Sequence, residues 1–386
     1  MPMIWLIGTD DMRLRLPLIE ALRARGFAVE VLGTASDEAF TEAGVTFRPY
    51  RLDRWIDPWG DWAACRQLRR LFRRHRPDVI HAIDTKPAIL APLAAPDDLI
   101  HRTVSTITGL GYLFSASTPL AWSLRPAFHW LQHAASRRTQ VMVFQNAEDR
   151  RYFLDHGLVR PGSDRLIRGS GIELDGSRPS SERLVRLRRE LGLNGMLVVL
   201  MISRLVALKG VREYLAAAAL VRAQRPDIAF LLAGPVANEG AQAVPLAEVR
   251  RAGASVRYLG PRSDVPALLA LADLFVLPTR YREGVPRVLL EAAASGLPLI
   301  TTDLPGCRDV VRHEWNGLLV PPGSAPALAD AILRLADAPD RRRAMGSRSR
   351  QRVQSEFTLD RVADAYAEVY EGVCRQARPR IGALAL

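Results

Sequence analysis

Short apolar segments recur along the first half of the chain, and amphipathic stretches separate them. The segments cover residues 4–7, 28–32, 45–47, 78–83, 102–107 and 140–144. Between residues 13 and 25, apolar side chains return every three to four positions, which is typical of a helix with one buried face. Strands that alternate with helices predict a parallel sheet covered by helices on both faces.

The same alternation returns after a segment rich in Gly, Ser and Pro at residues 169–180, a composition that marks a boundary. Beyond it, strands are expected at residues 197–202, 228–234, 256–260, 274–277 and 297–303, and helices near residues 326–336, 340–357 and 359–375. A chain of 386 residues is long enough for two domains. The sequence therefore predicts two Rossmann-like, doubly wound α/β domains.

Two glutamates lie near the start of one helix in the second half. Pro286 suits the first turn of that helix, and Gly296 suits its left-handed end. Glu283 is then in the loop before the helix, and Glu291 lies more than one turn inside it. A helix start favours a phosphate, and carboxylates accept hydrogen bonds from sugar hydroxyls, so a nucleotide sugar fits this spacing. The alternative is an ordinary helix with two solvated glutamates.

Two cations stand in a comparable place earlier in the same half. Arg204 and Lys209 follow the expected strand at residues 197–202 and precede a helix. The planar fork of Arg and the compact charge of Lys both suit phosphate oxygens. The alternative is two solvated surface cations.

These residues resemble a known family. Glu283 and Glu291, with seven residues between them, resemble the Glu-x7-Glu motif of retaining GT-B glycosyltransferases, especially the large family 4. The stretch from Ser203 to Gly210 resembles the Gly-Arg-Leu…Lys-Gly element of that family, with Ser203 in place of the Gly. The resemblance implies the GT-B fold, in which two domains face a central cleft. The domains are expected at residues 1–175 for the acceptor and 176–358 for the nucleotide sugar, with a helix at residues 359–386 crossing back to the first.

The resemblance also implies the chemistry. The enzyme is expected to move a hexose or N-acetylhexosamine-type sugar from a UDP-linked donor to a saccharide, with retention of the anomeric configuration and without a metal or other cofactor. Glu283, Arg204 and Lys209 are the expected catalytic residues, because the two cations stabilise the leaving diphosphate and Glu283 positions sugar hydroxyls. The expected donor-binding residues are Arg204, Lys209, Glu283, Gly284, Val285, Pro286, Glu291 and Arg262.

In relatives, loops at the carboxyl ends of strands in the first half hold the acceptor. The matching residues here are Gly8, Asp84, Lys86, Thr108 and Gly109. Relatives often carry a glycine pair where this chain has only Gly8, and many have a His where it has Thr108. The string at residues 108–114, Thr-Gly-Leu-Gly-Tyr-Leu-Phe, resembles a subgroup that acts on lipid-linked saccharides, so a polyprenyl-diphosphate-linked acceptor is expected. A Gly-rich turn with aromatic core residues is the alternative.

The net charge of the chain predicts a second partner, which is anionic. The chain carries a formal charge of +12, which favours an anionic partner. Two basic amphipathic stretches, residues 59–75 and 120–138, either pack on the sheet or contact an anionic membrane surface. Their large aromatic residues are Trp62, Phe72, Trp122, Phe128 and Trp130.

Three widely spaced cysteines, no signal peptide and no long uncharged apolar run lead to an expected location in the cytoplasm, peripheral to the cytoplasmic face of the membrane.

Three other classes fit less well. A UDP-sugar epimerase of the GT-B fold needs acid and base residues in the first half, where no convincing set is found. A dinucleotide oxidoreductase needs glycines where Asp10 and Arg13 follow Gly8. A basic membrane- or nucleic-acid-binding protein without catalysis would explain the charge but not the glutamate pair, and no nucleic-acid motif is present.

Overall fold

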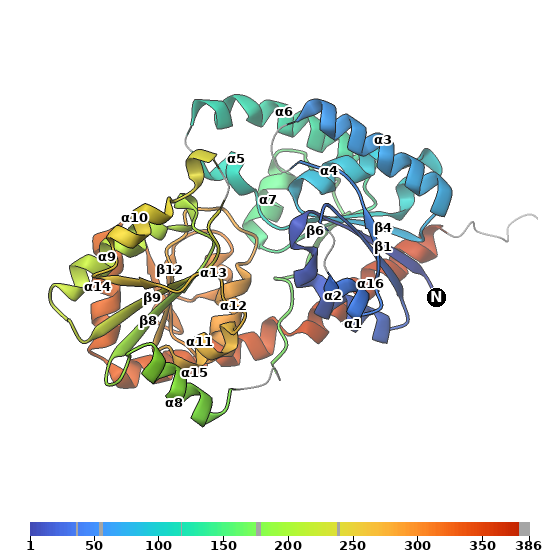
Figure 1. Cartoon of the computed structure of the whole chain (residues 1–386). Helices are drawn as coiled ribbons and strands as arrows, with labels where there is room; N and C mark the ends of the chain where they lie inside the picture. Colours follow the sequence, from blue (N-terminus) through green and yellow to red (C-terminus); the bar gives the residue numbers. More distant parts are fainter. Residues whose placement is uncertain (36–37, 54–56, 117, 175–178, 238–239, 378–386) are drawn as a thin grey trace, which may run out of the picture. The chain divides into compact units, whose positions relative to one another are not determined.

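The computed structural model describes residues 1–386 except 36–37, 54–56, 117, 175–178, 238–239 and 378–386 (Figure 1). The chain forms two compact units. Unit 1 combines Met1–Gly171 with the C-terminal segment that begins at Leu359, and unit 2 is Ile172–Thr358. The expected domain boundary between residues 175 and 176 lies outside the described residues. The two doubly wound α/β domains predicted from the alternating pattern are confirmed.

Unit 1 contains a seven-stranded parallel sheet in the order β3-β2-β1-β4-β5-β6-β7. Its strands are β1 (Met3–Ile7), β2 (Ala28–Gly33), β3 (Thr46–Pro49), β4 (Val79–Ile83), β5 (Thr103–Ile107), β6 (Val141–Phe144) and β7 (Asp164–Leu166). Its helices are α1 (Leu16–Ala24), α2 (Glu38–Glu42), α3 (Pro58–His75), α4 (Thr85–Ala94), α5 (Gly111–Ser115), α6 (Pro119–Ser136), α7 (Ala147–Asp155) and α16 (Leu359–Ala377).

The side chains of β1 show how the two faces of this sheet are covered. Ile4 and Leu6 pack in a core that includes residues of α1 and α16. Trp5 and Ile7 point to the opposite face, where α3 and α4 supply the partners. Because successive strand residues point to opposite faces, a strand buried on both sides is apolar throughout. Figure 1 shows α3, α4 and α6 on one side of the sheet, and α1 and α16 on the other.

Unit 2 contains a six-stranded parallel sheet in the order β10-β9-β8-β11-β12-β13. Its strands are β8 (Leu197–Ile202), β9 (Ile228–Ala233), β10 (Val256–Tyr258), β11 (Leu274–Leu277), β12 (Leu299–Thr302) and β13 (Gly317–Val320). Its helices are α8 (Ser181–Glu190), α9 (Val211–Arg222), α10 (Leu246–Arg251), α11 (Val265–Leu271), α12 (Arg287–Ala294), α13 (Cys307–Val310), α14 (Ala325–Ala336) and α15 (Pro339–Glu356).

A buried polar group joins α16 to the sheet of unit 1. The ring of His81 on β4 lies 2.6 Å from the Tyr370 hydroxyl and 2.7 Å from that of Thr106, which is 3.1 Å from the Tyr366 hydroxyl. Burial lowers the pKa of His81 to about 3, so its ring is neutral. Arg25, the residue that follows α1, adds ion pairs to Asp360 and Asp364 of α16. The last described helix is therefore an integral part of unit 1.

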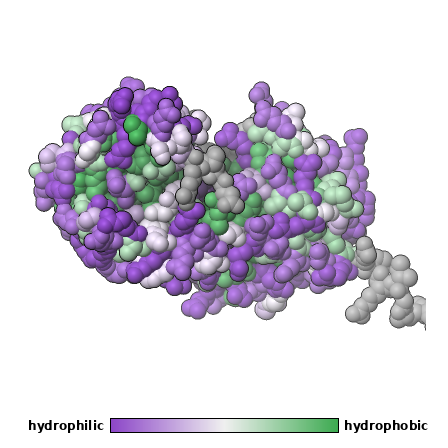
Figure 2. Space-filling model, turned by 90° about the horizontal axis from the view of Figure 1, so that it is seen from below, coloured by the Kyte–Doolittle hydropathy of each residue, from purple (hydrophilic) through white to green (hydrophobic). Residues whose placement is uncertain are grey.

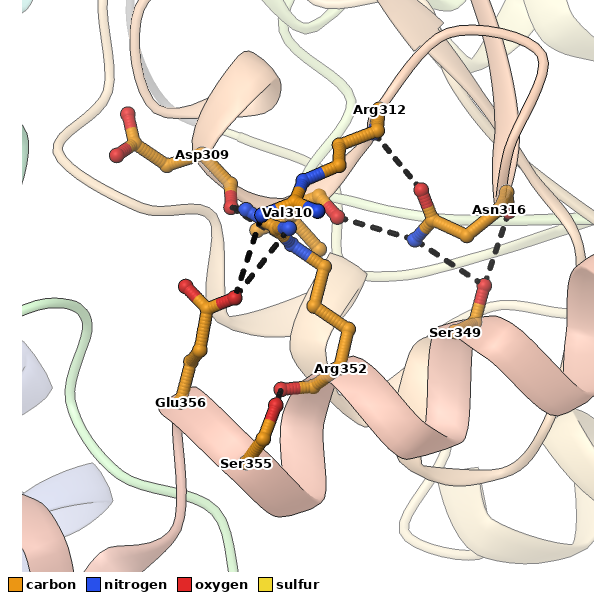
Figure 3. Close-up of polar contacts among 8 residues, drawn as sticks. All are labelled: Asp309, Val310, Arg312, Asn316, Ser349, Arg352, Ser355 and Glu356. Carbon is orange, nitrogen blue, oxygen red and sulfur yellow. Dashed lines mark hydrogen bonds and ion pairs between the residues drawn. The ribbon is translucent and has the colours of Figure 1, made fainter.

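A second polar cluster fixes α13 in unit 2 (Figure 3). The Asn316 amide donates to the Val310 carbonyl at 3.1 Å, and Ser349 on α15 donates to the Asn316 carbonyl at 3.0 Å. The buried Arg352, also on α15, donates to the Asp309 carbonyl at 2.7 Å. Because α15 is long and packed, it holds α13 and the glycine that precedes it in place.

The surface is mostly hydrophilic in the view of Figure 2, as a composition with 24% charged residues predicts. Within the described part of the chain, no helix has the length and hydropathy needed to span a membrane.

Candidate functional site

In unit 2, the loop between β11 and α12 brings Glu283 to Lys209. Lys209 Nζ lies 2.8 Å from Glu283 Oε2, and the two side chains are only 18% and 16% exposed. The Thr279 hydroxyl lies 3.3 Å from the other carboxylate oxygen of Glu283. The Tyr281 ring centre lies 5.4 Å from the same ammonium group. A largely buried ion pair thus stands at the carboxyl edge of the sheet, where ligands bind in doubly wound folds.

Two glycines allow the loops of this edge to meet. Gly210, with φ of +80°, follows Lys209, and a Cβ atom there would lie 2.0 Å from the Pro278 carbonyl oxygen. Gly306, with φ of +77°, precedes α13, and its Cβ would lie 2.0 Å from the Gly284 carbonyl oxygen. Neither position accepts a side chain without displacing backbone. The backbone on both sides of Glu283 is therefore fixed by close packing.

The residue that follows Gly306 is a buried cysteine. Burial, reinforced by the charge of Glu283, raises the pKa of the Cys307 thiol to about 12. A protonated, buried thiol is a poor nucleophile and metal ligand.

The segment of Gly284, Val285 and Pro286 is buried and leads directly into α12. Pro286 was expected in the first helical turn, but it is the residue before the helix, with ψ of 114°. The fixed φ of proline is compatible with either place, so the sequence alone does not separate them. Gly296 has φ of +80°, as expected for the left-handed end of the helix.

Glu291 and Arg262 each have a charged partner that the sequence analysis did not name. Glu291 Oε1 lies 2.9 Å from Arg287 Nε, one helical turn away. The Arg262 guanidinium forms two hydrogen bonds, of 2.8 and 2.6 Å, with the carboxylate of Asp264. The hydrogen bond to Arg262 lowers the pKa of Asp264. An i, i+4 Arg–Glu spacing was the available signal for the first pair.

Arg204 lies in the loop after β8 and is half-buried. The loop is packed tightly, since a Cβ on Gly234 would lie 1.9 Å from the Ser203 carbonyl oxygen. Ser203, which replaces the glycine of relatives, donates its hydroxyl to the Arg204 carbonyl at 3.0 Å. The structure thus places Arg204 and Lys209 in one loop at the carboxyl edge, as the strand–loop–helix pattern predicted.

In unit 1, the carboxyl ends of β4 and β5 bring Asp84 and Thr108 together. The Thr108 hydroxyl donates to Asp84 Oδ1 at 2.6 Å, and the Thr85 hydroxyl donates to the Gly109 carbonyl at 3.1 Å. Asp84 has φ of +77° and ψ of 158°, a backbone region used almost only by glycine. Holding a residue with a side chain there costs about 1–3 kcal/mol.

The other two predicted acceptor residues have mainly structural contacts. The Gly8 carbonyl accepts a hydrogen bond of 2.9 Å from the Tyr50 hydroxyl, and a Cβ there would meet the Met12 sulfur. Lys86 Nζ lies 2.6 Å from Asp61 on α3 and 2.6 Å from the Asp53 carbonyl. Burial raises the pKa of Asp61 although Lys86 opposes this effect. Lys86 therefore connects α4 to α3 in this structure.

No group of three or more His, Cys, Asp or Glu side chains with the geometry of a metal site occurs among the described residues.

Two family models match the chain, one in each unit. Residues 15–167 match the glycosyl transferase 4-like domain, and residues 186–352 match the glycosyl transferases group 1. The chain is 32% identical over 313 residues to the putative glycosyltransferase EpsD of Bacillus subtilis, covering 79% of this chain and 80% of that protein. This chain belongs to the group 1 glycosyltransferases.

Other glycosyltransferases match along most of the chain. It is 26% identical over 375 residues to the N,N'-diacetylbacillosaminyl-diphospho-undecaprenol alpha-1,3-N-acetylgalactosaminyltransferase of Campylobacter jejuni, covering 95% of this chain and 97% of that enzyme. Among solved structures, Anabaena HepE in complex with UDP-glucose superposes with a TM-score of 0.77 at 20% identity, covering 96% of this chain and 99% of HepE. The glycosyltransferase WaaG superposes with a TM-score of 0.73 at 17% identity, over 96% and 100% of the two chains. These superpositions show that the fold is GT-B.

Proposed function

We propose that this group 1 glycosyltransferase moves a hexose or N-acetylhexosamine-type sugar from a UDP-linked donor to a saccharide on a polyprenyl diphosphate, with retention of configuration. The Lys209–Glu283 ion pair is the observation that supports a nucleotide-sugar donor. A donor diphosphate competes with Glu283 for the Lys209 ammonium. Once that ammonium binds phosphate, the Glu283 carboxylate is released to accept hydrogen bonds from the sugar hydroxyls.

The reaction follows from the charges. The bond between the anomeric carbon and the donor phosphate oxygen breaks, and negative charge develops on the diphosphate. Lys209, together with Arg204 in the same loop, stabilises that charge. The acceptor hydroxyl attacks the anomeric carbon from the face that the phosphate leaves, and its proton passes to the departing phosphate. Glu291 holds the ribose through its remaining carboxylate acceptor capacity, and no metal takes part.

The choice of donor and acceptor rests on relatives. HepE was solved with UDP and with UDP-glucose. The Campylobacter relative and an Escherichia coli relative, the UDP-Gal:alpha-D-GlcNAc-diphosphoundecaprenol alpha-1,3-galactosyltransferase, are named for lipid-diphosphate acceptors. A Mycobacterium tuberculosis relative is named for GDP-mannose. UDP and a lipid-linked saccharide are therefore the first choices in a test that also includes GDP donors.

A panel of nucleotide sugars, each with and without a polyprenyl-diphosphate saccharide, tests the proposal. We expect UDP release to rise when the lipid-linked acceptor is added, and the NMR coupling of the new anomeric proton to match the donor configuration. Exclusive use of a GDP-linked donor would show that the proposed nucleotide, UDP, is wrong. An inverted product would overturn retention, and a free epimer formed without transfer would indicate an epimerase.

A membrane surface is the second partner, and the exposed aromatic residues of unit 1 support it. Trp59 and Trp62 on α3, and Trp122 and Trp130 on α6, are between 57% and 82% exposed. Both helices pack against α4 on the same side of the sheet (Figure 1). Exposed tryptophans beside cations suit the interface of an anionic bilayer.

Two other aromatic residues of these helices play a different part. Phe72 and Phe128, which the sequence grouped with the tryptophans, are buried in the core of unit 1. Of the five aromatic residues that the sequence grouped, the tryptophans are therefore the ones available to a lipid surface. We propose peripheral binding to the cytoplasmic leaflet, whose anionic lipids attract basic segments by roughly 1 kcal/mol per cation near the surface.

Vesicle flotation tests this contact. We expect binding to anionic but not neutral vesicles at low salt, and release at high salt. The double variant Trp122→Ser, Trp130→Ser should float less, and the variant with Arg69, Arg70, Arg73 and Arg74 changed to Ser should lose salt-sensitive binding. The matched control is Leu220→Ser, Val236→Ser, which removes two exposed apolar residues of unit 2. Equal, negligible flotation of the folded protein on both vesicle types would contradict the proposal.

A further inference from the structure

We infer that Arg125 on α6 binds the diphosphate of the lipid-linked acceptor, at a site that it forms with Phe114 of α5 and Trp122 of α6. The inference rests on the proposed function and adds to it a residue for the lipid end of the acceptor. Three features support it: the partners of Arg125, the charge of the chain around it, and the exposed apolar residues beside it.

The guanidinium group of Arg125 has no carboxylate partner among the described residues. Arg125 is half-buried, and its Nε donates to the Leu113 carbonyl of α5 at 3.1 Å. Its two terminal nitrogens have no hydrogen-bond acceptor within the described part of the chain. A half-buried cation of this kind is available to an anion that binds from outside. Other half-buried arginines of unit 1 pair with carboxylates, namely Arg25, Arg48, Arg102 and Arg138.

The chain around Arg125 contains no acidic residue. In the whole chain 41 of 386 residues are Asp or Glu, but none lies between Asp98 and Glu148. The strands β5 and β6 and the helices α5 and α6 all lie within this interval. A negatively charged ligand therefore approaches α5 and α6 without repulsion from carboxylates of these elements.

Two aromatic rings orient the guanidinium group. The central carbon of the group lies 5.2 Å from the centre of the Phe114 ring and 5.7 Å from that of the Trp122 ring. An aromatic face stabilises a guanidinium, whose planar fork matches two oxygens of a phosphate. Because α5 lies beside α6 (Figure 1), these ring contacts and the hydrogen bond to Leu113 fix the cation where the two helices meet.

The exposed apolar residues beside Arg125 indicate that the phosphate belongs to a lipid. Leu120 and Trp122, in the first turn of α6, are 63% and 62% exposed. An apolar chain attached to the phosphate covers such side chains, whereas inorganic phosphate leaves them in water. Leu113, whose carbonyl accepts from Arg125, is part of the string at residues 108–114 that resembles enzymes with lipid-linked acceptors. The ligand is therefore the acceptor diphosphate rather than the headgroup of a neighbouring lipid.

Acceptor kinetics in detergent solution test this site with two substitutions. Arg125→Gln removes the charge, and Arg125→Lys keeps the charge but loses the fork. We expect Arg125→Gln to lower kcat/KM for a saccharide on polyprenyl diphosphate by about 10–100-fold, mainly through KM, because hydrogen bonds to a charged group are lost. Arg125→Lys should recover part of this loss. For the same saccharide without the diphosphate, and for donor hydrolysis, Arg125→Gln should behave as the wild type does.

The matched control is Arg137→Gln. It removes the exposed arginine that follows the same helix, α6, and it should leave kcat/KM for the lipid-linked acceptor unchanged.

Calorimetry with farnesyl diphosphate measures the site directly, at saturating UDP so that the donor site is occupied. The wild type should bind farnesyl diphosphate but not farnesol, and Arg125→Gln should bind it at least about 10-fold more weakly. Burial and the charges of His156 and Arg125 lower the pKa of His129, one turn along α6. Bound diphosphate should raise that pKa in an NMR titration, a shift that a purely structural role of Arg125 would not produce.

Vesicle flotation separates the two sources of phosphate. If the acceptor diphosphate is the ligand, Arg125→Gln floats on anionic vesicles as the wild type does. If Arg125→Gln loses flotation but keeps normal kcat/KM for the lipid-linked acceptor in detergent, the phosphate is that of a lipid headgroup and the inference is wrong.

Two further results would overturn the site. Equal losses of kcat/KM for both saccharides, with a lower melting temperature, would make Arg125 a structural link between α5 and α6. Unchanged kcat/KM and unchanged affinity for farnesyl diphosphate in Arg125→Gln would remove Arg125 from acceptor binding. The proposed function fails separately, when the wild type transfers no sugar to any saccharide although it still binds farnesyl diphosphate through Arg125.

Discussion

The carboxyl edges of the two parallel sheets hold their carboxylates in different ways. In unit 2, oppositely charged side chains meet in pairs: Lys209 with Glu283, Arg287 with Glu291, and Arg262 with Asp264. In unit 1, Lys86 also forms an ion pair, with Asp61, but the Asp84 carboxylate accepts a hydrogen bond from the neutral Thr108 hydroxyl and sits on a strained backbone. Paired charges suit a ligand that brings its own charge and replaces a partner. A strained carboxylate among hydroxyls suits a neutral ligand that must be oriented.

The largest expected effect comes from removing the cation of the central pair in unit 2. Lys209→Ala should lower kcat by about 10²–10³-fold, the usual loss when one stabilising group of a charged transition state is removed. Steady-state kinetics with a thermal melt measure it. Arg212→Ala, which removes an exposed cation of α9 paired with Glu248, is the control and should leave kcat near normal. A collapse of stability with normal activity per folded molecule would make Lys209 structural.

A smaller effect is expected at the ribose end of the proposed donor site. Glu291→Ala should weaken UDP binding by about 1.5–3 kcal/mol, because a charge-assisted hydrogen bond is lost. Calorimetry with free UDP measures the change. Glu248→Ala removes the carboxylate of another arginine pair in unit 2 and should not alter the affinity. If Glu291→Ala binds UDP with unchanged affinity, Glu291 is not part of the donor site.

Acid should distinguish the cores of the two units. His81 is buried and its folded-state pKa is about 3, below the value of about 6.5 of an unfolded histidine. The unfolded chain therefore binds more protons between these values, and stability falls as pH drops through 6.5. From pH 7 to pH 5 unit 1 should lose about 2 kcal/mol. Unit 2, whose one histidine is the exposed His313, should lose much less. Denaturation of His81→Gln at both pH values should show a flatter dependence; an identical slope would contradict this assignment.

The smallest expected effect is a difference in salt sensitivity. Binding of UDP in unit 2 should weaken several-fold from low to high salt, because the Debye length falls from about 10 Å to about 3 Å over that range. The KM for a neutral soluble saccharide should change by less than about twofold, because an uncharged ligand binds through hydrogen bonds, which are the contacts expected at Asp84 and Thr108. Isothermal titration and initial rates over a salt series measure the two. If UDP binding and the saccharide KM depend equally on salt, the proposed difference between the carboxyl edges of the two sheets is wrong.

Much of this arrangement follows from local sequence. Apolar strands such as residues 197–202 and 274–277 are buried on both faces, so their positions were predictable, and so were the loops with Arg204 and Lys209. The short strands β7 and β13 were missed as separate strands. β7 reads Asp-Arg-Leu, which has no apolar pattern, and β13 reads Gly-Leu-Leu-Val, an apolar run of only three residues after a glycine.

Contacts between distant residues were not predictable in the same way. The approach of Lys209 to Glu283 depends on Gly210 and Gly306, whose role is visible only when the loops are assembled. Likewise, helical spacing in the basic stretches did not separate the buried Phe72 from the exposed Trp62, because both lie on amphipathic α3 and only packing decides which is covered. The strain at Asp84 has no sequence signal, since nothing local favours a non-glycine residue there.

The return of α16 to unit 1 determines the order in which a growing chain is able to fold. Unit 2 is one continuous segment and has all its residues once Thr358 has been made. Unit 1 begins first, but Arg25 lacks its partners Asp360 and Asp364, and His81 lacks Tyr370, until these residues emerge from the ribosome. The face of the unit 1 sheet that α16 covers therefore stays exposed while unit 2 is synthesised. Such a delayed, long-range closure is the step at which a nascent chain is most exposed to aggregation and chaperone binding.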